Sequence, residues 1–198
     1  GSFRFAVFGE SRQPATPLEK VLSLRLSEKI NLYIEAAAFV GKGAQETAKT
    51  VEKPTVTTNT GYKSFEINDS LFLQLDTSAK GLRLSHREQW HWLLSQLDGY
   101  KGDNIFIFMA DHPDSFSDPL EGKLLKDTLT NLRQSRVKNI WVFYKGTENK
   151  SKMDRGIKYI ECAGFDAAGI TPDNPDAALY TLVTVKGDKV TYEFKPII

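Results

Sequence analysis

Three apolar stretches of the sequence each end in a short run of polar residues whose side chains could bind or act on a ligand. These residues are Glu10, Ser11 and Arg12 after the first stretch, Asp111 and His112 after the second, and Lys145, Thr147, Glu148 and Asn149 after the third. In an open α/β sheet, ligands gather at the carboxyl ends of the strands, because the loops diverge there and leave a crevice. We therefore predict that Glu10, Asp111 and Glu148 lie in one cleft.

Three ionised carboxylates in one cleft would repel one another, and each would raise the proton affinity of the others. A compensating positive charge is therefore expected nearby. Arg12 and Lys145 lie close in sequence to the candidate carboxylates. We predict that these two side chains supply the compensating charge.

The elements that must position these residues alternate between strand and helix. "FRFAVFG" is a buried strand that ends at Gly9, and the hairpin "SFEINDSLFLQLDT" turns at Asn68 and Asp69. Three helices are expected: one capped by Thr16 with Glu19, one capped by Ser85 with Glu88, and one capped by Asp118 before Pro119. Their predicted buried stripes are Leu18, Val21, Leu22 and Leu26, then Trp90, Leu93, Leu94 and Leu97, then Leu120, Leu124, Leu125, Leu129 and Leu132.

The second half of the chain contains further strands, at "NIFIFMA", "NIWVFYKG" and "IKYIECAG", and a final hairpin that turns at Gly187 and Asp188. The segment "KGTENKSKMDRG" between two of these strands is expected to be a loop. Strand-to-helix crossovers followed by antiparallel strands predict a single α/β domain over residues 1–198. The predicted buried core residues are Phe5, Val7, Ile105, Ile107, Phe108, Ile140, Val142 and Ile160.

The composition excludes several classes of partner. With 26 Lys and Arg against 25 Asp and Glu, the net charge of +1 provides no global field that would attract nucleic acid or an anionic membrane. The apolar stretches are far shorter than the roughly 20 residues of a membrane-spanning helix. The single cysteine, Cys162, excludes an internal disulfide and is expected to be a buried, inert thiol.

The order of "GESR", "FEINDSLFLQLDTS", "SHREQWHWLLSQL", "IFIFMADHP", "IWVFYKGTEN" and "GIKYIECAG" resembles that of the calcineurin-like metallophosphoesterases, which include the purple acid phosphatases. The resemblance runs from Phe3 to about Phe194. It implies an α/β fold in which two sheets of mixed parallel and antiparallel strands form a β-sandwich flanked by helices. It also implies a site in which two metal ions activate a water molecule to attack a phosphate ester.

The sequence departs from the family at nearly every expected metal ligand. Glu10 replaces the aspartate of the GD-x-[HR] motif, while Arg12 fits its last position. No aspartate follows Val40, where GD-x-x-D is expected, and Asn59 has no neighbouring histidine or acid to complete GNH-[DE]. Asp111 precedes His112 where the family usually has a histidine, and Thr147 and Asn149 replace both histidines of GH-x-H. The segment 30–62 also looks shortened.

Three interpretations follow. The first is a noncatalytic metallophosphoesterase-like domain that has a binding or structural role and no cofactor, with Arg12 and Lys145 supplying charge in place of metal ions. The second is a phosphoesterase with an atypical divalent metal site, Mn, Fe or Zn, made by Glu10, Asp111, His112 and Glu148. A Rossmann-type nucleotide-binding domain ranks last, because "GESRQP" lacks the glycine-rich fingerprint.

The expected partner is a small phosphorylated ligand or a neighbouring domain, with no nucleic acid and no membrane span, in a larger secreted or cell-surface bacterial protein. We interpret His86 and His91 as solvated helix residues. The basic run "KSKMDRGIK" at 150–158 is interpreted as a solvated segment, with binding of phosphate or a polyanion as its alternative.

Overall fold

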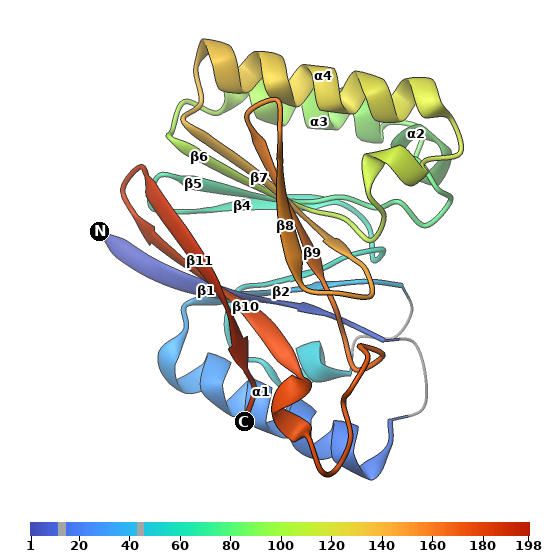
Figure 1. Cartoon of the computed structure of the whole chain (residues 1–198). Coiled ribbons are helices and arrows are strands. Elements are labelled where there is room, and N and C mark those ends of the chain that lie inside the picture. Colours follow the sequence, from blue (N-terminus) through green and yellow to red (C-terminus); the bar gives the residue numbers. More distant parts are fainter. Residues whose placement is uncertain (12–14, 43–45) are drawn as a thin grey trace.

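The computed structural model describes residues 1–11, 15–42 and 46–198. Two mixed sheets pack face to face, with helices on both outer sides (Figure 1). The first sheet has the order β11 (Lys189–Pro196), β10 (Leu179–Lys186), β1 (Ser2–Gly9), β2 (Ala36–Val40) and β3 (Thr55–Thr57). The second has the order β4 (Lys63–Ile67), β5 (Ser70–Gln74), β6 (Asn104–Phe108), β7 (Asn139–Lys145), β9 (Ile157–Cys162) and β8 (Lys150–Asp154).

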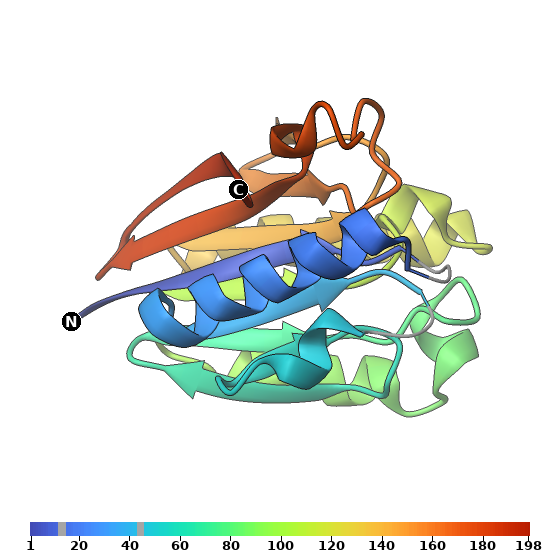
Figure 2. The ribbon, with the colours of Figure 1, turned by 90° about the horizontal axis from the view of Figure 1, so that it is seen from below.

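The helices form the two outer layers. Helix α1 (Pro17–Tyr33) lies across the outer face of the first sheet (Figure 2), while α3 (Gln89–Gly99) and α4 (Pro119–Ser135) cover the second (Figure 1). Four short helices lie in the connections between the longer elements: η1 (Thr47–Thr50), α2 (Leu82–Ser85), η2 (Pro113–Ser115) and η3 (Pro175–Ala177). The two-sheet α/β sandwich expected from the sequence is thus confirmed.

All eight predicted core residues are buried. Four of them lie between the sheets, namely Phe5, Val7, Phe108 and Ile160, and the other four lie between the second sheet and its helices. The ring of Phe5 makes edge contacts with Phe106 and Phe72, with ring centroids 4.8 and 5.0 Å apart. Burying one such ring contributes about 2–3 kcal/mol, so this aromatic layer holds the two sheets together.

Helix starts follow the sequence at two of the three predicted positions. The Thr16 hydroxyl accepts a hydrogen bond from the Glu19 amide at 3.2 Å, and the Asp118 carboxylate accepts one from the Leu120 amide at 3.0 Å. The prediction for Ser85 is wrong. Ser85 ends α2, and its hydroxyl donates back to the Gly81 carbonyl, so α3 begins only at Gln89 without a side-chain cap.

The predicted apolar stripes are wider than the faces that the helices bury. In α4, Leu120 is 75% exposed and Leu124 is 50% exposed, and in α1 Val21 is 49% exposed. Leu94 of α3 is also exposed. Each helix touches its sheet along a narrow arc, which in α4 contains Leu125 and Leu129.

The segment expected to be a loop at 145–156 contains a strand. Strand β8 pairs antiparallel with β9, and the chain turns between them at Arg155 and Gly156, both with positive φ. Its five residues are nearly all exposed, so the apolar alternation that predicts a strand is missing. The segment 30–62, which looked shortened, contains β2, η1 and β3.

Parallel pairing brings the carboxyl ends of the strands to one edge of the molecule. Strands β1, β2 and β3 are parallel in the first sheet, as are β5, β6, β7 and β9 in the second. A backbone hydrogen bond of 3.1 Å from the Gly9 amide to the Ala163 carbonyl joins the two sheets at this edge, and another of 3.1 Å from the Gly146 amide to the Cys162 carbonyl joins the ends of β7 and β9 within the second sheet. The candidate residues after these strands therefore follow a shared edge.

Candidate functional site

Glycines allow the strand ends to approach closely at this edge. A Cβ atom on Gly9 would clash with the backbone of Cys162 and Ala163. Gly41 has φ +151°, and a Cβ there would lie 2.6 Å from the Glu10 carbonyl oxygen. A side chain at either glycine would separate strands that the site requires to be adjacent.

Asp111 is the centre of the charged cluster at this edge. Its side chain is 6% exposed, and its Oδ2 atom accepts a hydrogen bond from the Thr77 hydroxyl at 2.7 Å. Its Oδ1 atom lies 2.7 Å from Lys80 Nζ and 3.2 Å from Lys42 Nζ. Burial alone would raise the pKa of Asp111, but hydrogen bonds from Lys80, Thr77 and Lys42 outweigh it and lower the pKa. Asp111 is therefore an ionised carboxylate held by two ammonium groups.

Glu10 is a buried acid that forms no ion pair with any of the residues described by the structure. It is 4% exposed, and its Oε1 atom has no hydrogen-bond partner among the described residues. Burial raises the pKa of Glu10 to about 7, repulsion from Glu46 adds to this, and hydrogen bonding to Thr47 opposes it. Its raised proton affinity thus comes first from burial, whereas the sequence argument attributed it to crowding with Asp111 and Glu148.

The loop after β5 is fixed by Asp76 and Asn59. The Asp76 carboxylate accepts hydrogen bonds from the Gly61 and Ser78 amides at 3.1 and 2.9 Å, and its Oδ2 atom lies 2.8 Å from His86 Nε2. The Asn59 side-chain oxygen accepts from the Thr77 amide at 3.0 Å. His86, interpreted from the sequence as solvated, is thus part of the network that positions Thr77 against Asp111.

Lys145 supplies positive charge to a different acid from those expected. Its Nζ atom lies 2.9 Å from both carboxylate oxygens of Asp166. The Ser11 hydroxyl donates to Asp166 Oδ1 and accepts from the Asp166 amide, both at 3.0 Å. Ser11 and Lys145 therefore anchor the loop after β9. Arg12, the other predicted source of charge, lies outside the described residues.

The loop after β7 is held by its backbone and leaves the Glu148 side chain in solvent. The amides of Thr147 and Glu148 donate to Glu161 Oε2 at 3.1 and 2.9 Å. The Asn149 side-chain oxygen accepts from the Ala163 amide at 3.1 Å. The Glu148 carboxylate is 69% exposed, and its ion-pair partner is Lys150 at 3.8 Å.

His112 lies in a separate groove, although it follows Asp111 directly. Its Nδ1 atom accepts a hydrogen bond from the Asp114 amide at 2.9 Å, and its ring packs against Tyr144 and Tyr159, with centroids 4.9 and 5.0 Å away. Burial lowers the pKa of His112, so the ring is neutral at pH 7 with its proton on Nε2. We call this cavity, of about 620 Å³, the His112 groove; it is lined by His112, Asp114, Ser115, Tyr144, Lys150, Ser151, Lys152, Tyr159 and Glu161.

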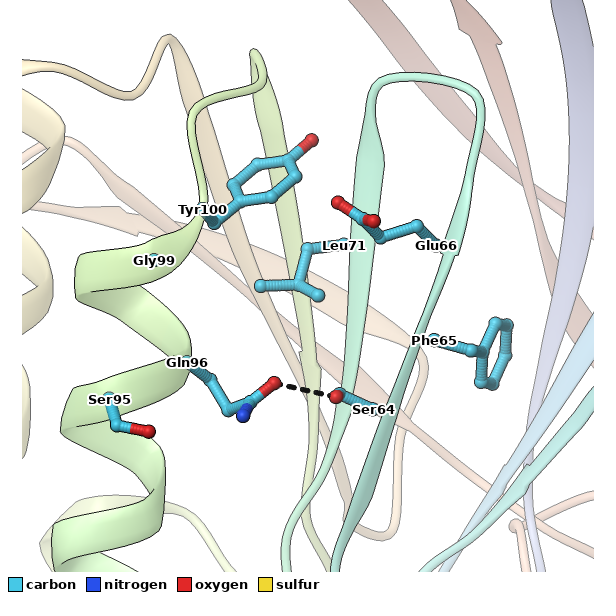
Figure 3. Close-up of a pocket in the computed structure, with 8 residues that line it drawn as sticks. All are labelled: Ser64, Phe65, Glu66, Leu71, Ser95, Gln96, Gly99 and Tyr100. Atoms are coloured by element: carbon cyan, nitrogen blue, oxygen red, sulfur yellow. Dashed lines mark hydrogen bonds between the residues drawn. The ribbon is translucent and has the colours of Figure 1, made fainter.

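A smaller cavity of about 350 Å³ lies between α3 and the edge strand β4 (Figure 3). The Ser64 hydroxyl donates to the Gln96 side-chain oxygen at 2.7 Å, and Leu71 and Tyr100 line the cavity farther along. Burial raises the pKa of Tyr100 to about 12, so its phenol stays protonated. Glu66 is the one carboxylate among its lining residues, so this cavity offers no paired groups for catalysis.

The residues at the strand ends do not fit a metal centre. Among the described residues, no three His, Cys, Asp or Glu side chains come together in a way that could hold an ion. The six remaining residues, at 12–14 and 43–45, contain none of these residue types. The four residues of the alternative ligand set have different surroundings. Glu10 is buried, with no hydrogen-bond partner for Oε1 among the described residues, and Asp111 is bound by lysines. His112 lines the His112 groove, and Glu148 is exposed. Glu10 Oε1, which has no hydrogen-bond partner in the part of the chain that the structure describes, would suit a cation.

Sequence analysis missed the two lysines that hold Asp111. Lys42 carries a signal that could have been used, because it follows the apolar run "AAAFV" and Gly41 just as Glu10 follows "FRFAVF" and Gly9. Lys80 has no comparable signal. It belongs to a turn, with φ 61°, and it reaches Asp111 only through the tertiary fold.

No protein-family profile matches the chain, and no curated protein matches it in sequence. Among solved structures, GAP50, the anchor in the inner membrane complex of Plasmodium, aligns with 99% of this chain and 85% of its own, with a TM-score of 0.66 and 13% identity. Zinc-bound wild-type Vps29 from Entamoeba histolytica aligns with 98% of this chain and 99% of its own, at a TM-score of 0.48 and 10% identity. Vps29 from Chaetomium thermophilum aligns with 98% of this chain and 100% of its own, with a TM-score of 0.43 and 11% identity. The likeness to GAP50 shows a shared fold along the whole chain.

Proposed function

We propose that this chain is a degenerate, noncatalytic member of the calcineurin-like metallophosphoesterase superfamily that serves as a binding or structural module. The observation that carries the proposal is the position of Lys42 and Lys80 on Asp111. Both ammonium groups contact the same carboxylate oxygen, at the strand edge where the family resemblance implies metal ions. Positive charge at this edge comes from side chains of the chain itself.

The chemistry of lysine opposes metal binding here. A protonated ammonium group has three donors and no lone pair, so it cannot act as a metal ligand. A divalent ion at Asp111 would have to displace both lysines or lie beside two positive charges. A dinuclear site further needs roughly six N or O ligands, more than the strand ends offer.

The place of Lys42 in the chain supports the same conclusion. It directly follows Gly41 at the end of β2, where the GD-x-x-D motif of the family has its first aspartate. The exchange of a carboxylate for an ammonium group reverses the charge at a position that the resemblance assigns to a ligand. Lys42 and Lys80 together balance the negative charge of Asp111, so the protein itself supplies the counter-charge.

The proposed partner is a small phosphorylated ligand or a neighbouring domain of a larger bacterial protein, secreted or at the cell surface. GAP50 is described as an anchor, which is a precedent for a structural role on this fold. Within the described residues, no helix is long and apolar enough to cross a membrane.

Hydrolysis of p-nitrophenyl phosphate and bis(p-nitrophenyl) phosphate, with added manganese, zinc or iron, tests the proposal. We expect no turnover above the metal-only background, and no difference between the unmodified protein, His112→Ala and Asp111→Asn. Turnover that copurifies with the protein and is lost in either variant would overturn the proposal in favour of an atypical phosphoesterase. The variants serve as controls because contaminating phosphatases would be unaffected by them.

A further inference from the structure

Strand β8 combines an open sheet edge with a basic side-chain pattern. It is the last strand of the six-stranded sheet and pairs on one side with β9, so its other side presents backbone N–H and C=O groups without a neighbouring strand (Figure 1). Such an edge can accept an added strand. The sequence "KSKMDRGIK" around it carries three lysines and one arginine against one aspartate.

The side chains of β8 alternate between two surroundings. The Ser151 hydroxyl contacts the Tyr192 hydroxyl of β11, which places Ser151 toward the other sheet. Lys150 and Lys152 line the His112 groove, and by the alternation of side chains along a strand they point to the face opposite to the Ser151 hydroxyl, although Ser151 also borders the groove. Any strand that pairs with β8 would therefore present alternate side chains to this groove.

The cations of the groove are less fully paired than its acids. Asp114 is bound by Lys126, and Glu161 already accepts hydrogen bonds from two backbone amides. Lys150 lies 3.8 Å from the nearest carboxylate oxygens, and Lys152 forms no ion pair with any residue that the structure describes. Positive charge is thus available along the edge.

The groove also offers aromatic walls and a further donor. Tyr144 and Tyr159 flank the imidazole of His112, and the Nε2–H of His112 has no acceptor within the described ranges. Lys152 and His112 both line the groove, so a carboxylate bound there has an ammonium group and this N–H donor available. The lining therefore suits an acidic side chain better than an apolar one.

We propose that β8 and the His112 groove bind an extended acidic segment of a partner protein, which adds a strand to the sheet edge and places alternate carboxylates against Lys150 and Lys152. This inference rests on the proposed function as a binding module and names the class of its partner. A second copy of the chain is a poor occupant, because an antiparallel pairing of two β8 strands about Lys152 would set this lysine against its own copy.

The test uses a fluorescein-labelled peptide of about eight residues that alternates glutamate with valine or threonine, and a matched peptide with lysine in place of glutamate. We expect the acidic peptide alone to bind, with shifts and slowed hydrogen exchange at the amides of residues 150–154. Lys152→Glu should weaken binding by about tenfold or more. The matched control is Lys63→Glu on β4, the opposite edge strand of the same sheet, and it should change affinity by less than about twofold.

Three outcomes would overturn the inference: no binding of the acidic peptide, equal loss of binding in both charge variants, or amide shifts that avoid β8. Full displacement of the peptide by the same concentration of inorganic phosphate would also overturn it, since the site would then bind small anions. Hydrolysis of p-nitrophenyl phosphate is measured on the same preparation. Turnover would count against the proposed function, while the peptide result is read independently.

Discussion

At the scale of single residues, neighbours decide what each candidate group can do. Asp111 and His112 are adjacent in sequence, yet Asp111 is bound by Lys42 and Lys80 while His112 packs between two tyrosines. Glu10, at the same strand edge, forms no ion pair with any described residue, and burial raises its pKa. Three residues that look alike as ligands in the sequence thus have three different roles.

The pKa of Glu10 is raised by burial from its ordinary value of 4.5 to about 7, which predicts that the stability of the fold depends on pH. Between pH 4.5 and 7, Glu10 is ionised in the unfolded chain but protonated in the folded chain. The contribution of Glu10 to the free energy of unfolding is therefore complete below pH 4.5 and is lost as the pH rises through 7. Glu10→Gln removes this loss. As the pH rises from 4.5 to 8, we expect the free energy of unfolding of the variant to increase by about 3 kcal/mol relative to that of the unmodified protein.

Urea unfolding across this pH range measures the gain. The exposed Glu148→Gln serves as the control and should change the free energy of unfolding by less than about 0.5 kcal/mol. A pH profile for Glu10→Gln that runs parallel to that of the unmodified protein would show that Glu10 is not buried as an acid.

Removing one ammonium group from Asp111 should destabilise the fold. Lys80→Met takes away the shorter of the two ion pairs and leaves Lys42, so we expect a loss of about 1–2 kcal/mol at pH 7. Lys80→Met combined with Asp111→Asn should recover most of it, because no buried charge then remains. The pKa of Asp111 lies below its usual value, so the loss should shrink as the pH falls through that pKa.

The control for this measurement is Lys138→Met, which removes exposed ion pairs with Asp188 and Asp103 and should cost clearly less stability than Lys80→Met. Equal losses for the two single variants, or no recovery in the double variant, would mean that Asp111 does not depend on its lysines.

At the scale of elements, the site depends on the close meeting of β1 and β9. Gly9→Ala would place a methyl group against the backbone of Cys162 and Ala163, which cannot move without separating the strands. We expect a loss of about 2–3 kcal/mol in thermal or urea unfolding. Gly99→Ala is the matched control, since a Cβ there meets nothing within 4 Å, and a loss at Gly99 as large as at Gly9 would refute the close approach.

Elements with an apolar face could be predicted from the sequence, and exposed ones could not. The burial of β1, β6, β7 and β9 follows from their apolar runs, and the caps of α1 and α4 follow from Thr16 and Asp118. Strand β8 was missed because pairing with β9, not burial, holds it in place. Ser85 looked like a cap because its type and spacing fit one, but its hydroxyl bonds to Gly81.

The candidate site was predictable only in part for a related reason. Parallel strands with polar residues at their ends predict a shared edge, and the backbone hydrogen bonds of Gly9 and Gly146 tie these ends together. Which side chains meet there depends on turns and loops. Lys80 approaches Asp111 from a turn 31 positions away, a contact that no local pattern encodes.

At the scale of the whole molecule, two sheets pack face to face, and lysine side chains balance the acids at the edge where the parallel strands end. The aromatic layer around Phe5 and the parallel strand ends keep the architecture shared with GAP50. The charge balance of the edge is internal, with Lys42 and Lys80 on Asp111 and Lys145 on Asp166. A fold whose buried acids are balanced by its own lysines can serve in binding without catalysis.

The most direct test of this account is the metal content of the purified protein. The protein is equilibrated with excess manganese, zinc and iron, desalted, and measured by mass spectrometry of the elements against protein concentration. We expect far less than one ion per chain for each metal, because the ammonium groups of Lys42 and Lys80 lie where an ion would bind Asp111. One or two ions retained per chain would contradict it.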